Sequence, residues 1–547
     1  MKQLWIGALL SVVLVSCLTR PTQFTSEQVW LTAPTGEKMQ AQVPITFVPA
    51  KNAYEGLVMN PTPKQCFEGI GVSLTESSAF VLACLPKETR DAVLQEFFGQ
   101  EGANFSMVRT HIGSCDFSVE GKYALAEVPG DTAMTSFSLF HDKEGFSPCR
   151  YPQIVDTTYD LYHLMVDVAF IKSQQTDTVY KIMACPWTAP AWMKDNNAYY
   201  QRGNGVARGG KLLPQYYNAY AKYITKFIEA YKQEGIPVWA VTPVNEPMGN
   251  DGGWESMDMS PAEEAAFIAR NLSPALKEAN LDTKILAFDQ NTFEMAPYVA
   301  AVYGDSMANA ATAGMAVHWY GSTVSSFPDM LDSVYANHID KLIIHTEGCV
   351  DNLGCPPWDA VTDPEGFTEK NWFNNDAFWW NKEATDWAYS TPFWPELHPK
   401  YSVVERYVTY FLEGVEHRMN GFIDWNMALD KQGGPNHVSN FCGAPLMVDT
   451  DTKQLYYTPY YYALKQLSTT MRPGDVIFGI SDQHSQKSPL YTCASVNADG
   501  QIAIQLYNAS DADYTTLLNI DNYQATITVP ARALLTIVTP QGIGSLL

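Results

Sequence analysis

Short apolar runs that end in polar residues alternate with helical patterns through the middle of the chain. The apolar runs begin near Cys66, Phe105, Tyr180, Ile236, Lys284, Gly314, Lys341 and Gly421. The ranges with the helical spacing of apolar residues include Pro86 to Gly99, Leu213 to Glu234, Pro261 to Ala279 and Val403 to Glu416. A strand followed by a helix, repeated eight times, is the pattern of a (β/α)8 barrel. We therefore predict an α/β chain built around a TIM barrel.

The two ends of the chain carry a different pattern. From Phe24 to Met59, and again from Asp475 to Leu547, apolar and polar residues alternate with the two-residue period of strands. Between the barrel and the second of these segments, a Tyr-rich stretch from Tyr456 to Thr469 predicts a last helix. We expect an attached β-sandwich side domain built from both chain ends, with residues 17–63 as its N-terminal linker and β segment, 64–468 as the barrel and 469–547 as the C-terminal sandwich.

Two glutamates follow apolar runs at the positions of the fourth and seventh barrel strands. Glu246 lies in VTPVNEPM and Glu347 in KLIIHTEGCV. They lie about a hundred residues apart, which fits three successive β/α units of roughly 30 or more residues. In a (β/α)8 barrel the active site lies at the C-terminal ends of the strands, so both carboxyl groups should face one pocket. A single glutamate of this kind is more often a cap or a surface ion pair, but two facing carboxyl groups are the machinery of glycoside hydrolysis.

Other polar residues fall on the same predicted rim. Arg109 ends an apolar strand, where it either pairs with a core carboxylate or orients the nucleophilic glutamate and holds its pKa low. His318 and Tyr320 follow the sixth strand and share one face by its two-residue period. His345 and Glu347 also share a face, and with His318 they could be considered as metal ligands. No HxH or HExxH spacing accompanies them, so we expect neither a metal nor another cofactor.

Aromatic residues make up 13% of the chain, with 14 Trp and 30 Tyr. Most must lie in the core, but exposed rings are the surfaces on which sugars stack. Trp187 lies in a proline-punctuated loop after the third strand, and we expect it to line a sugar site. Six tryptophans between residues 351 and 400 either shape a substrate cleft or pack that segment against the barrel; they are Trp358, Trp372, Trp379, Trp380, Trp387 and Trp394.

Length and charge narrow the class of protein. The 547 residues suit a large barrel with a smaller partner domain, and 46% hydrophobic against 17% charged residues indicates a well-packed globular protein. A formal net charge of −24 argues against nucleic acid and anionic membrane surfaces as partners. An uncharged substrate would be indifferent to that charge. We expect a monomer.

The N-terminus has the features of an export signal. Lys2 precedes an apolar stretch from Leu4 to Val15, which is too short for a permanent membrane helix. The stretch ends in Leu-Val-Ser-Cys, which resembles a bacterial lipobox, and this resemblance implies that residues 1–16 are removed and that Cys17 carries lipid. The alternative is a plain secretory peptide. We expect an exported lipoprotein of the bacterial outer membrane, on its periplasmic or cell-surface face, that contacts the membrane only through this anchor.

Nine further cysteines give an odd number, so at least one thiol stays free. Their spacing contains no paired CxxC of the kind that binds zinc. Cys349 and Cys355 are near enough in sequence to bridge under oxidising conditions, whereas several of the others lie in apolar runs typical of buried thiols.

Six motifs together resemble glycoside hydrolase family 30, which includes glucosylceramidases and microbial endo-β-1,6-glucanases. They are IGSCDFS, PWTAPAWMK, VNEPM, HWY, HTEGC and DWN, in the family's order over about 400 residues. The resemblance implies a TIM barrel with a β-sandwich and a retaining double displacement without metal. It implies that Glu246 is the acid/base, Glu347 the nucleophile and Asn245 a partner of the sugar 2-hydroxyl. The implied subsite for the cleaved sugar is lined by Arg109, Asp116, Trp187, His318, Tyr320 and Trp425.

The substrate is a β-glucan or β-glucoside by the same resemblance. The motif NDGGWESM and the Trp-rich segment look more like the microbial β-1,6-glucanase branch, and an exported lipoprotein suits polysaccharide foraging. An exo-acting β-glucosidase or a glucosylceramidase-like enzyme is the first alternative. A surface glycan-binding lipoprotein without catalysis is the second, although both glutamates, Asn245 and Arg109 are present.

Overall fold

The computed structural model describes residues 22–52, 55–176, 179–200, 209–249, 253–351, 372–382, 396, 397, 399 and 401–544. The expected signal peptide and Cys17 lie outside the described residues, as do Cys355 and three of the six tryptophans, Trp358, Trp387 and Trp394. Within the described part of the chain, no helix is both long and apolar enough to cross a membrane.

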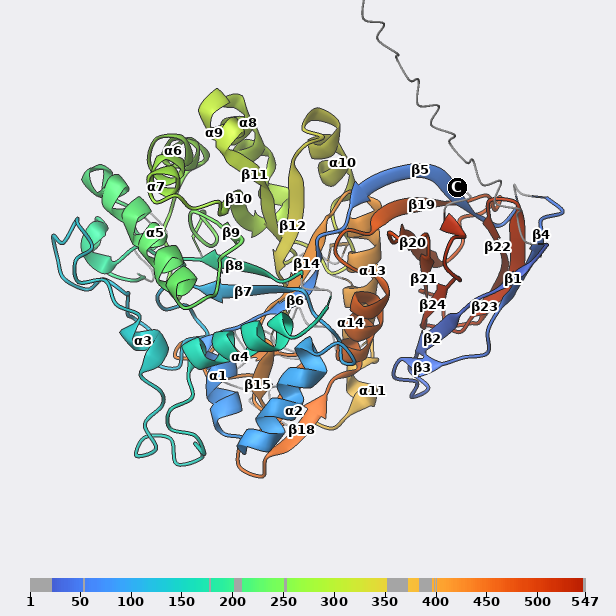
Figure 1. Ribbon diagram of the computed structural model, residues 1–547, viewed down its shortest axis with the longest axis horizontal. Coiled ribbons are helices and arrows are strands. Elements are labelled where there is room, and N and C mark those ends of the chain that lie inside the picture. The colour runs from blue at the N-terminus through green and yellow to red at the C-terminus, as the bar shows by residue number, and fades with distance from the viewer. Residues whose placement is uncertain are drawn as a thin grey trace, which may run out of the picture.

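Eight parallel strands close the predicted barrel, shown at the left of Figure 1. In chain order they are β6 (Gly69–Ser73), β7 (Met107–His111), β8 (Lys181–Cys185), β9 (Ala240–Val241), β10 (Lys284–Asn291), β11 (Thr312–His318), β12 (Leu342–Glu347) and β14 (Gly421–Asp424). Each strand pairs with the one before and after it, and β14 returns to β6. The fold prediction is confirmed, with Glu246 after the fourth strand and Glu347 at the end of the seventh.

The inside of the barrel is filled by one apolar side chain from each strand except β6. This buried layer consists of Met107, Met183, Ala240, Leu286, Ala316, Ile344 and Ile423. On β6 the chain has Gly71 instead, because a Cβ there would lie 1.7 Å from the carbonyl oxygen of Met107. The layer closes the barrel interior, as in other TIM barrels.

Helices cover the outside of the barrel. They are α1 (Glu76–Ala83), α2 (Lys87–Phe98), α3 (Phe140–Lys143), α4 (Leu161–Ser173), α5 (Tyr217–Gln233), α6 (Pro261–Phe267), α7 (Ser273–Glu278), α8 (Ala296–Gly304), α9 (Ser306–Ala311), α10 (Pro328–Asn337), α11 (Asp376–Trp379), α13 (Val403–Glu416) and α14 (Pro459–Thr470). Ser260 caps α6 with a full capping box to Glu263, as its sequence position predicts. The helix predicted over Pro261 to Ala279 is divided, because a π-helical turn at Ile268–Leu272 separates α6 from α7.

The last predicted helix begins later than expected. Tyr456 and Tyr457 end β18 (Gln454–Tyr457), which pairs with β17 (Leu446–Asp449), and β17 also pairs with β15 (Ala428–Asp430). The helix α14 begins only at Pro459, whose fixed φ and missing N–H suit the first helical turn. A further short ladder joins β13 (Val350–Asp351) to β16 (Cys442–Gly443).

Strands from both chain ends form one eleven-stranded sheet, as predicted. From the N-terminal end come β1 (Phe24–Thr25), β2 (Gln28–Thr32), β3 (Gln40–Ala41), β4 (Thr46–Pro49) and β5 (Leu57–Cys66). From the C-terminal end come β19 (Val476–Asp482), β20 (Leu490–Val496), β21 (Ile502–Asn508), β22 (Tyr514–Ile520), β23 (Tyr523–Val529) and β24 (Leu534–Val538). The pairs β5 with β19, β2 with β24 and β4 with β23 join the two ends. The sheet encloses its own apolar core.

The barrel and the side domain meet along α13 and α14, which lie between them in Figure 1. Gln466 of α14 is buried and donates from Nε2 to the carbonyl oxygens of Trp30 and Leu534, while its Oε1 accepts a hydrogen bond from Thr32. One buried side chain therefore binds strands from both ends of the chain.

Candidate active site

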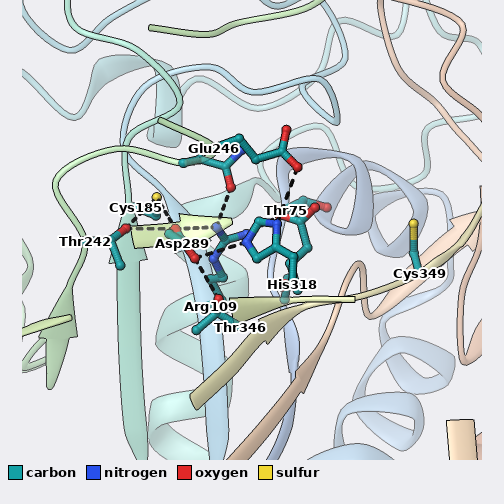
Figure 2. Close-up of polar contacts among 12 residues, drawn as sticks. Thr75, Arg109, Cys185, Thr242, Glu246, Asp289, His318, Thr346 and Cys349 are labelled. Atoms are coloured by element: carbon teal, nitrogen blue, oxygen red, sulfur yellow. Dashed lines mark hydrogen bonds and ion pairs between the residues drawn. The ribbon is translucent and has the colours of Figure 1, made fainter. Parts of the chain in front are cut away.

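The two candidate catalytic glutamates face each other at the C-terminal end of the barrel. One carboxylate oxygen of Glu246, one of Glu347 and a ring nitrogen of His318 all lie within 4.8 Å of one another. Glu347 is buried, whereas the Glu246 side chain keeps 14% of its surface exposed. Figure 2 shows Glu246 above the cluster formed by His318, Asp289 and Arg109. The sequence prediction that both carboxyl groups reach one pocket therefore agrees with the structure.

Both oxygens of Glu347 are held by hydrogen bonds. Arg109 donates from Nη1 to Oε2 at 2.5 Å, and the Tyr320 hydroxyl donates to Oε1 at 3.0 Å. Burial raises the pKa of Glu347, and the charges of His318 and Arg109 counteract only part of that rise. The expectation that Arg109 holds this pKa low is therefore wrong in net direction, although Arg109 does orient the carboxylate as predicted.

The loop that carries Glu246 is held by its backbone. The predicted strand from Ile236 to Val244 shortens to the two residues of β9, because the prolines on either side, Pro237 and Pro243, lack the N–H that a central strand must donate. Beyond β9, the Asn245 N–H donates to the Pro186 carbonyl at 2.8 Å and the Glu246 N–H to the Asp289 carbonyl at 2.9 Å. Glu246 has a φ of +46°, a strained conformation for a glutamate that turns its side chain into the pocket.

Asp289 lies at the centre of the site and was not predicted. Its carboxylate is completely buried and accepts hydrogen bonds from five side chains on five strands or strand ends. The donors are Arg109 Nη2 at 2.8 Å, Cys185 Sγ at 3.0 Å, Thr242 Oγ1 at 2.9 Å, His318 Nε2 at 3.1 Å and Thr346 Oγ1 at 2.6 Å. Burial acts to raise the pKa of Asp289, but Arg109 and His318 outweigh it and hold the pKa far below its usual range. Asp289 is therefore an ionised carboxylate inside the barrel.

A β-bulge turns Asp289 inward. In the pairing of β10 with β11, Phe288 pairs with Ala316 and Gln290 with Val317, so Asp289 is the extra residue. Phe288 and Asp289 both have positive φ, and the Phe288 N–H donates to the buried carboxyl group of Glu264 at 2.7 Å. The two-residue alternation of a strand does not reveal such a bulge. Asp289 could still have been predicted as a site residue, because it follows an apolar run in the same way as Glu246 and Glu347.

Arg109 joins these carboxylates to Asn245. Its Nη2 donates to Asn245 Oδ1 at 2.7 Å as well as to Asp289. The guanidinium carbon lies 4.6 Å from the ring centre of Trp187 and 5.6 Å from that of Trp425, and the two indoles stack at 5.2 Å. Both rings are only 1% exposed. The structure thus brings both tryptophans to the site as packing for Arg109, and their contact with a sugar stays a prediction.

His318 is placed between two acids. Its Nδ1 lies 3.4 Å from Glu246 Oε1, and its Nε2 contacts Asp289. Burial acts to lower the pKa of His318, but the negative charges of Glu347 and Asp289 have the larger effect. Together they raise this pKa above its ordinary value, to about 9. The imidazole is therefore protonated at neutral pH. The trio of Glu246, His318 and Glu347 is spaced closely enough to ligate a metal, and a metal ion that bound there would have to displace the proton of His318.

The side chains of the sixth and seventh strands divide between two faces. His318 and Tyr320 point into the pocket together, as predicted, whereas Trp319 packs outside the barrel against Tyr407. His345 stacks on Phe422 at 4.3 Å and does not share a face with Glu347. The reason is a second bulge, because Val317 pairs with His345 and His318 with Glu347, leaving Thr346 as the extra residue.

Asp116 forms part of the pocket wall contributed by the loop after β7. It is buried and accepts a hydrogen bond from Asn440 Nδ2 at 2.9 Å. Burial, followed by the nearby charge of Glu347, raises its pKa well above the usual value. The charge of Glu255, which accepts hydrogen bonds from Ser114 and His437, acts in the same direction.

Three tryptophans of the Trp-rich segment pack against the barrel. Trp372 and Trp379 are fully buried and stack at 6.2 Å, and Trp380 is nearly buried. The Trp372 indole donates to the Lys431 carbonyl at 2.7 Å. For these three residues the packing alternative is the correct one.

A parallel barrel with two carboxylates facing each other at the C-terminal ends of its strands defines the chemistry of a glycoside hydrolase. The sequence comparison agrees: the Glycosyl hydrolase family 30 TIM-barrel domain matches residues 67–363 and 397–471, and the Glycosyl hydrolase family 30 beta sandwich domain matches residues 477–537. The chain belongs to glycoside hydrolase family 30.

Curated relatives and a solved structure resemble most of the chain. The lysosomal acid glucosylceramidase of Mus musculus is 25% identical over 484 residues, covering 87% of this chain and 82% of the relative. The endo-1,6-beta-D-glucanase BGN16.3 of Trichoderma harzianum is 25% identical over 487 residues, covering 87% and 84%. The solved structure of the endo-beta1,6-glucanase BT3312 superposes with a TM-score of 0.70 at 23% identity, covering 94% of this chain and 99% of that one.

Proposed function

We propose that this enzyme hydrolyses β-glucosidic bonds with retention of configuration, with Glu347 as nucleophile and Glu246 as acid/base. The separation of the two carboxylates carries the proposal, because oxygens of the two groups lie within 4.8 Å. Retaining enzymes keep their carboxyl groups about 5 Å apart, whereas inverting enzymes need about 6.5–9.5 Å to hold a water molecule. A separation of this size suits the retaining class.

In the first step, Glu347 attacks the anomeric carbon while Glu246 donates its proton to the departing glycosidic oxygen. The bond from carbon to that oxygen breaks, and a glycosyl ester of Glu347 forms. In the second step, Glu246 removes a proton from water, whose oxygen attacks the anomeric carbon and releases Glu347. Glu246 suits this role because it is the more exposed of the two and therefore the one that water reaches.

The neighbouring residues fix the geometry of the attack. Arg109 and Tyr320 hold both oxygens of Glu347, so only a small rotation is left to the nucleophile. Asn245 is oriented by Arg109 and can hydrogen-bond the sugar 2-hydroxyl. The protonated His318 lies beside Glu246 and stabilises its carboxylate after the proton has been transferred.

For the substrate, we propose β-1,6-glucan cleaved within the chain. The support comes from the relatives named as endo-1,6-beta-glucanases in Trichoderma harzianum and Neurospora crassa. In each case the match to this chain covers more than 80% of the relative. The alternative is an exo-acting, glucosylceramidase-like hydrolase, which the mouse and Caenorhabditis elegans relatives favour.

The product profile on linear β-1,6-glucan tests this choice, with β-1,3-glucan, β-1,4-glucan and an aryl β-glucoside alongside. Early mixed oligosaccharides from the β-1,6 polymer alone support endo-glucanase action, and glucose as the sole early product contradicts it.

Replacement of the acid/base should separate good from poor leaving groups. In Glu246→Gln the glycosidic oxygen receives no proton, so kcat/KM for a glucan should fall by about 10²- to 10⁴-fold. For a dinitrophenyl β-glucoside, whose leaving group needs no proton, the fall should be much smaller, and deglycosylation becomes rate-limiting. Initial rates on both substrates check this. An equal loss on both would show that Glu246 is not the acid.

We also propose that the chain is exported and carries lipid on Cys17, on the strength of the N-terminal pattern alone. Labelled palmitate should be incorporated by bacterial cells that express the full chain. Cys17→Ser should lose the label, whereas Cys66→Ser should keep it. Label that persists in the Cys17 variant would contradict the assignment.

A further inference from the structure

Two buried cysteines meet directly beside the site. The sulfur atoms of Cys349 and Cys442 lie 3.3 Å apart, and both side chains are almost fully buried. Cys349 follows Glu347 by two residues, and Figure 2 shows its sulfur at the edge of the site. We propose that Cys349 and Cys442 form a disulfide that links the strand of the nucleophile to the opposite pocket wall.

The backbone around the pair is already in place for such a bond. The antiparallel ladder of β13 with β16 pairs Asp351 with Cys442 and Val350 with Gly443. On the other side, the Trp319 indole donates to the Cys349 carbonyl at 3.2 Å, and the Trp425 N–H donates to the Gly348 carbonyl at 2.8 Å. A disulfide requires a sulfur separation of about 2.05 Å. The two sulfur atoms must therefore move closer for the bond to form, and the ladder keeps the two backbones adjacent.

The bond would join two segments that each contact residues of the site. Cys349 Sγ lies 3.4 Å from the Tyr320 hydroxyl, which donates to Glu347. Cys442 lies two residues after Asn440, which donates to Asp116 on the far wall. The cross-link therefore fixes the end of β12 relative to the loop that holds Asp116. The bond does not depend on the proposed reaction, and its failure would leave the roles of Glu246 and Glu347 untouched.

The oxidation requires an external disulfide as electron acceptor, such as oxidised glutathione or a dithiol oxidase of an exported compartment. One cysteine thiolate attacks that disulfide, forms a mixed disulfide and releases one thiol of the oxidant. The second thiolate then attacks the protein sulfur and releases the other thiol. The two cysteines lose two protons and two electrons, and the oxidant is reduced to two thiols.

Peptide mapping tests the bond. The full chain is refolded in a glutathione redox buffer, free thiols are alkylated with iodoacetamide, and the non-reduced digest is read by mass spectrometry. We expect one peptide pair joined through Cys349 and Cys442 that separates on reduction. Alkylated Cys349 and Cys442, or a bond from Cys349 to Cys355, would overturn the proposal.

Thermal unfolding gives a second readout that does not depend on activity. The bond would close a loop of about 90 residues, so reduction with dithiothreitol should lower the Tm of the oxidised protein by on the order of 5 °C. Cys442→Ala should have a Tm that dithiothreitol does not change. The matched control is Cys84→Ala, another buried cysteine, which should keep the full shift. A wild-type Tm that does not respond to reductant, or a shift that survives in Cys442→Ala, would contradict the bond.

Discussion

Glu347→Gln should lower kcat on glucan and on an aryl β-glucoside by about 10⁴-fold or more, because the amide cannot form the glycosyl ester. Binding of a glucan oligosaccharide should change little, since Gln keeps the shape of the side chain. Its oxygen can accept from Arg109, and its NH2 can donate to the Tyr320 hydroxyl oxygen once that hydroxyl hydrogen has turned away. Steady-state kinetics measure the first effect, and isothermal titration calorimetry with an oligosaccharide measures the second.

The matched control for Glu347 is Glu88→Gln, an exposed glutamate in the first turn of α2, which should keep the wild-type rate. The smaller variant Glu347→Ala adds a second test on an activated aryl β-glucoside, since azide can enter the vacated space and attack the anomeric carbon from the side of the missing carboxylate. This single displacement inverts the configuration, so an α-glucosyl azide product would place the nucleophile at residue 347. Near wild-type turnover in Glu347→Gln would refute the assignment.

Asp289→Asn is expected to damage both the fold and the reaction, although Asp289 does not contact the proposed path of the substrate. All five side chains around its carboxylate donate hydrogen bonds, so the amide nitrogen of an asparagine must face at least one donor. Arg109 would also lose a buried partner. Removal of one member of a buried ion pair costs about 3–5 kcal/mol, and urea unfolding at pH 7 should show a loss of that size.

A positioning role for Asp289 predicts a change in pH dependence as well. The pKa of His318 is about 9, and Asp289 contributes to this elevation. His318 is charged below that pKa and neutral above it, so activity that needs the imidazolium should fall as the pH rises through about 9. Without the negative charge of Asp289, this alkaline limb of kcat/KM should move to lower pH. A variant that was merely less stable would keep the limb where it is.

Asp424→Asn is the matched control for Asp289. Asp424 is equally buried at the end of β14, but burial raises its pKa well above the usual value, whereas the pKa of Asp289 lies far below its usual range. It accepts one hydrogen bond from the Tyr407 hydroxyl at 2.7 Å, which an asparagine oxygen can replace. If Asp289→Asn and Asp424→Asn lose similar amounts of stability, the ionised network around Asp289 is not what supports the site.

The features that could be predicted from the sequence are those set by the local pattern of apolar and polar residues. An apolar run followed by a glutamate identified the end of the seventh strand and the loop after the fourth strand. The two-residue period correctly placed His318 and Tyr320 on one face. The switch from helical to alternating pattern after the barrel likewise separated the two domains. These features are local, so no knowledge of the neighbouring strands was needed.

Features that depend on how strands pair were missed. The bulge at Asp289 and the one at Thr346 change which face each residue reaches, and neither leaves a mark in the apolar pattern. The contact of Cys349 with Cys442 joins residues from distant parts of the chain, so Cys355 seemed the natural partner in sequence. The pKa of Glu347 was misjudged for a similar reason, because a motif shows its cationic neighbour but not its burial.

The division of the side-domain sheet between the two chain ends has a consequence for biosynthesis. A ribosome releases β1 to β5 first, but their partners β19, β23 and β24 emerge only after the entire barrel has been translated. At about 5–20 residues per second, the early strands wait on the order of tens of seconds with unpaired edges and apolar side chains in solvent. Until those partners arrive, the early strands expose edges and apolar side chains of the kind that favour aggregation. A circular permutant that begins at β6 and joins the natural termini would remove the delay.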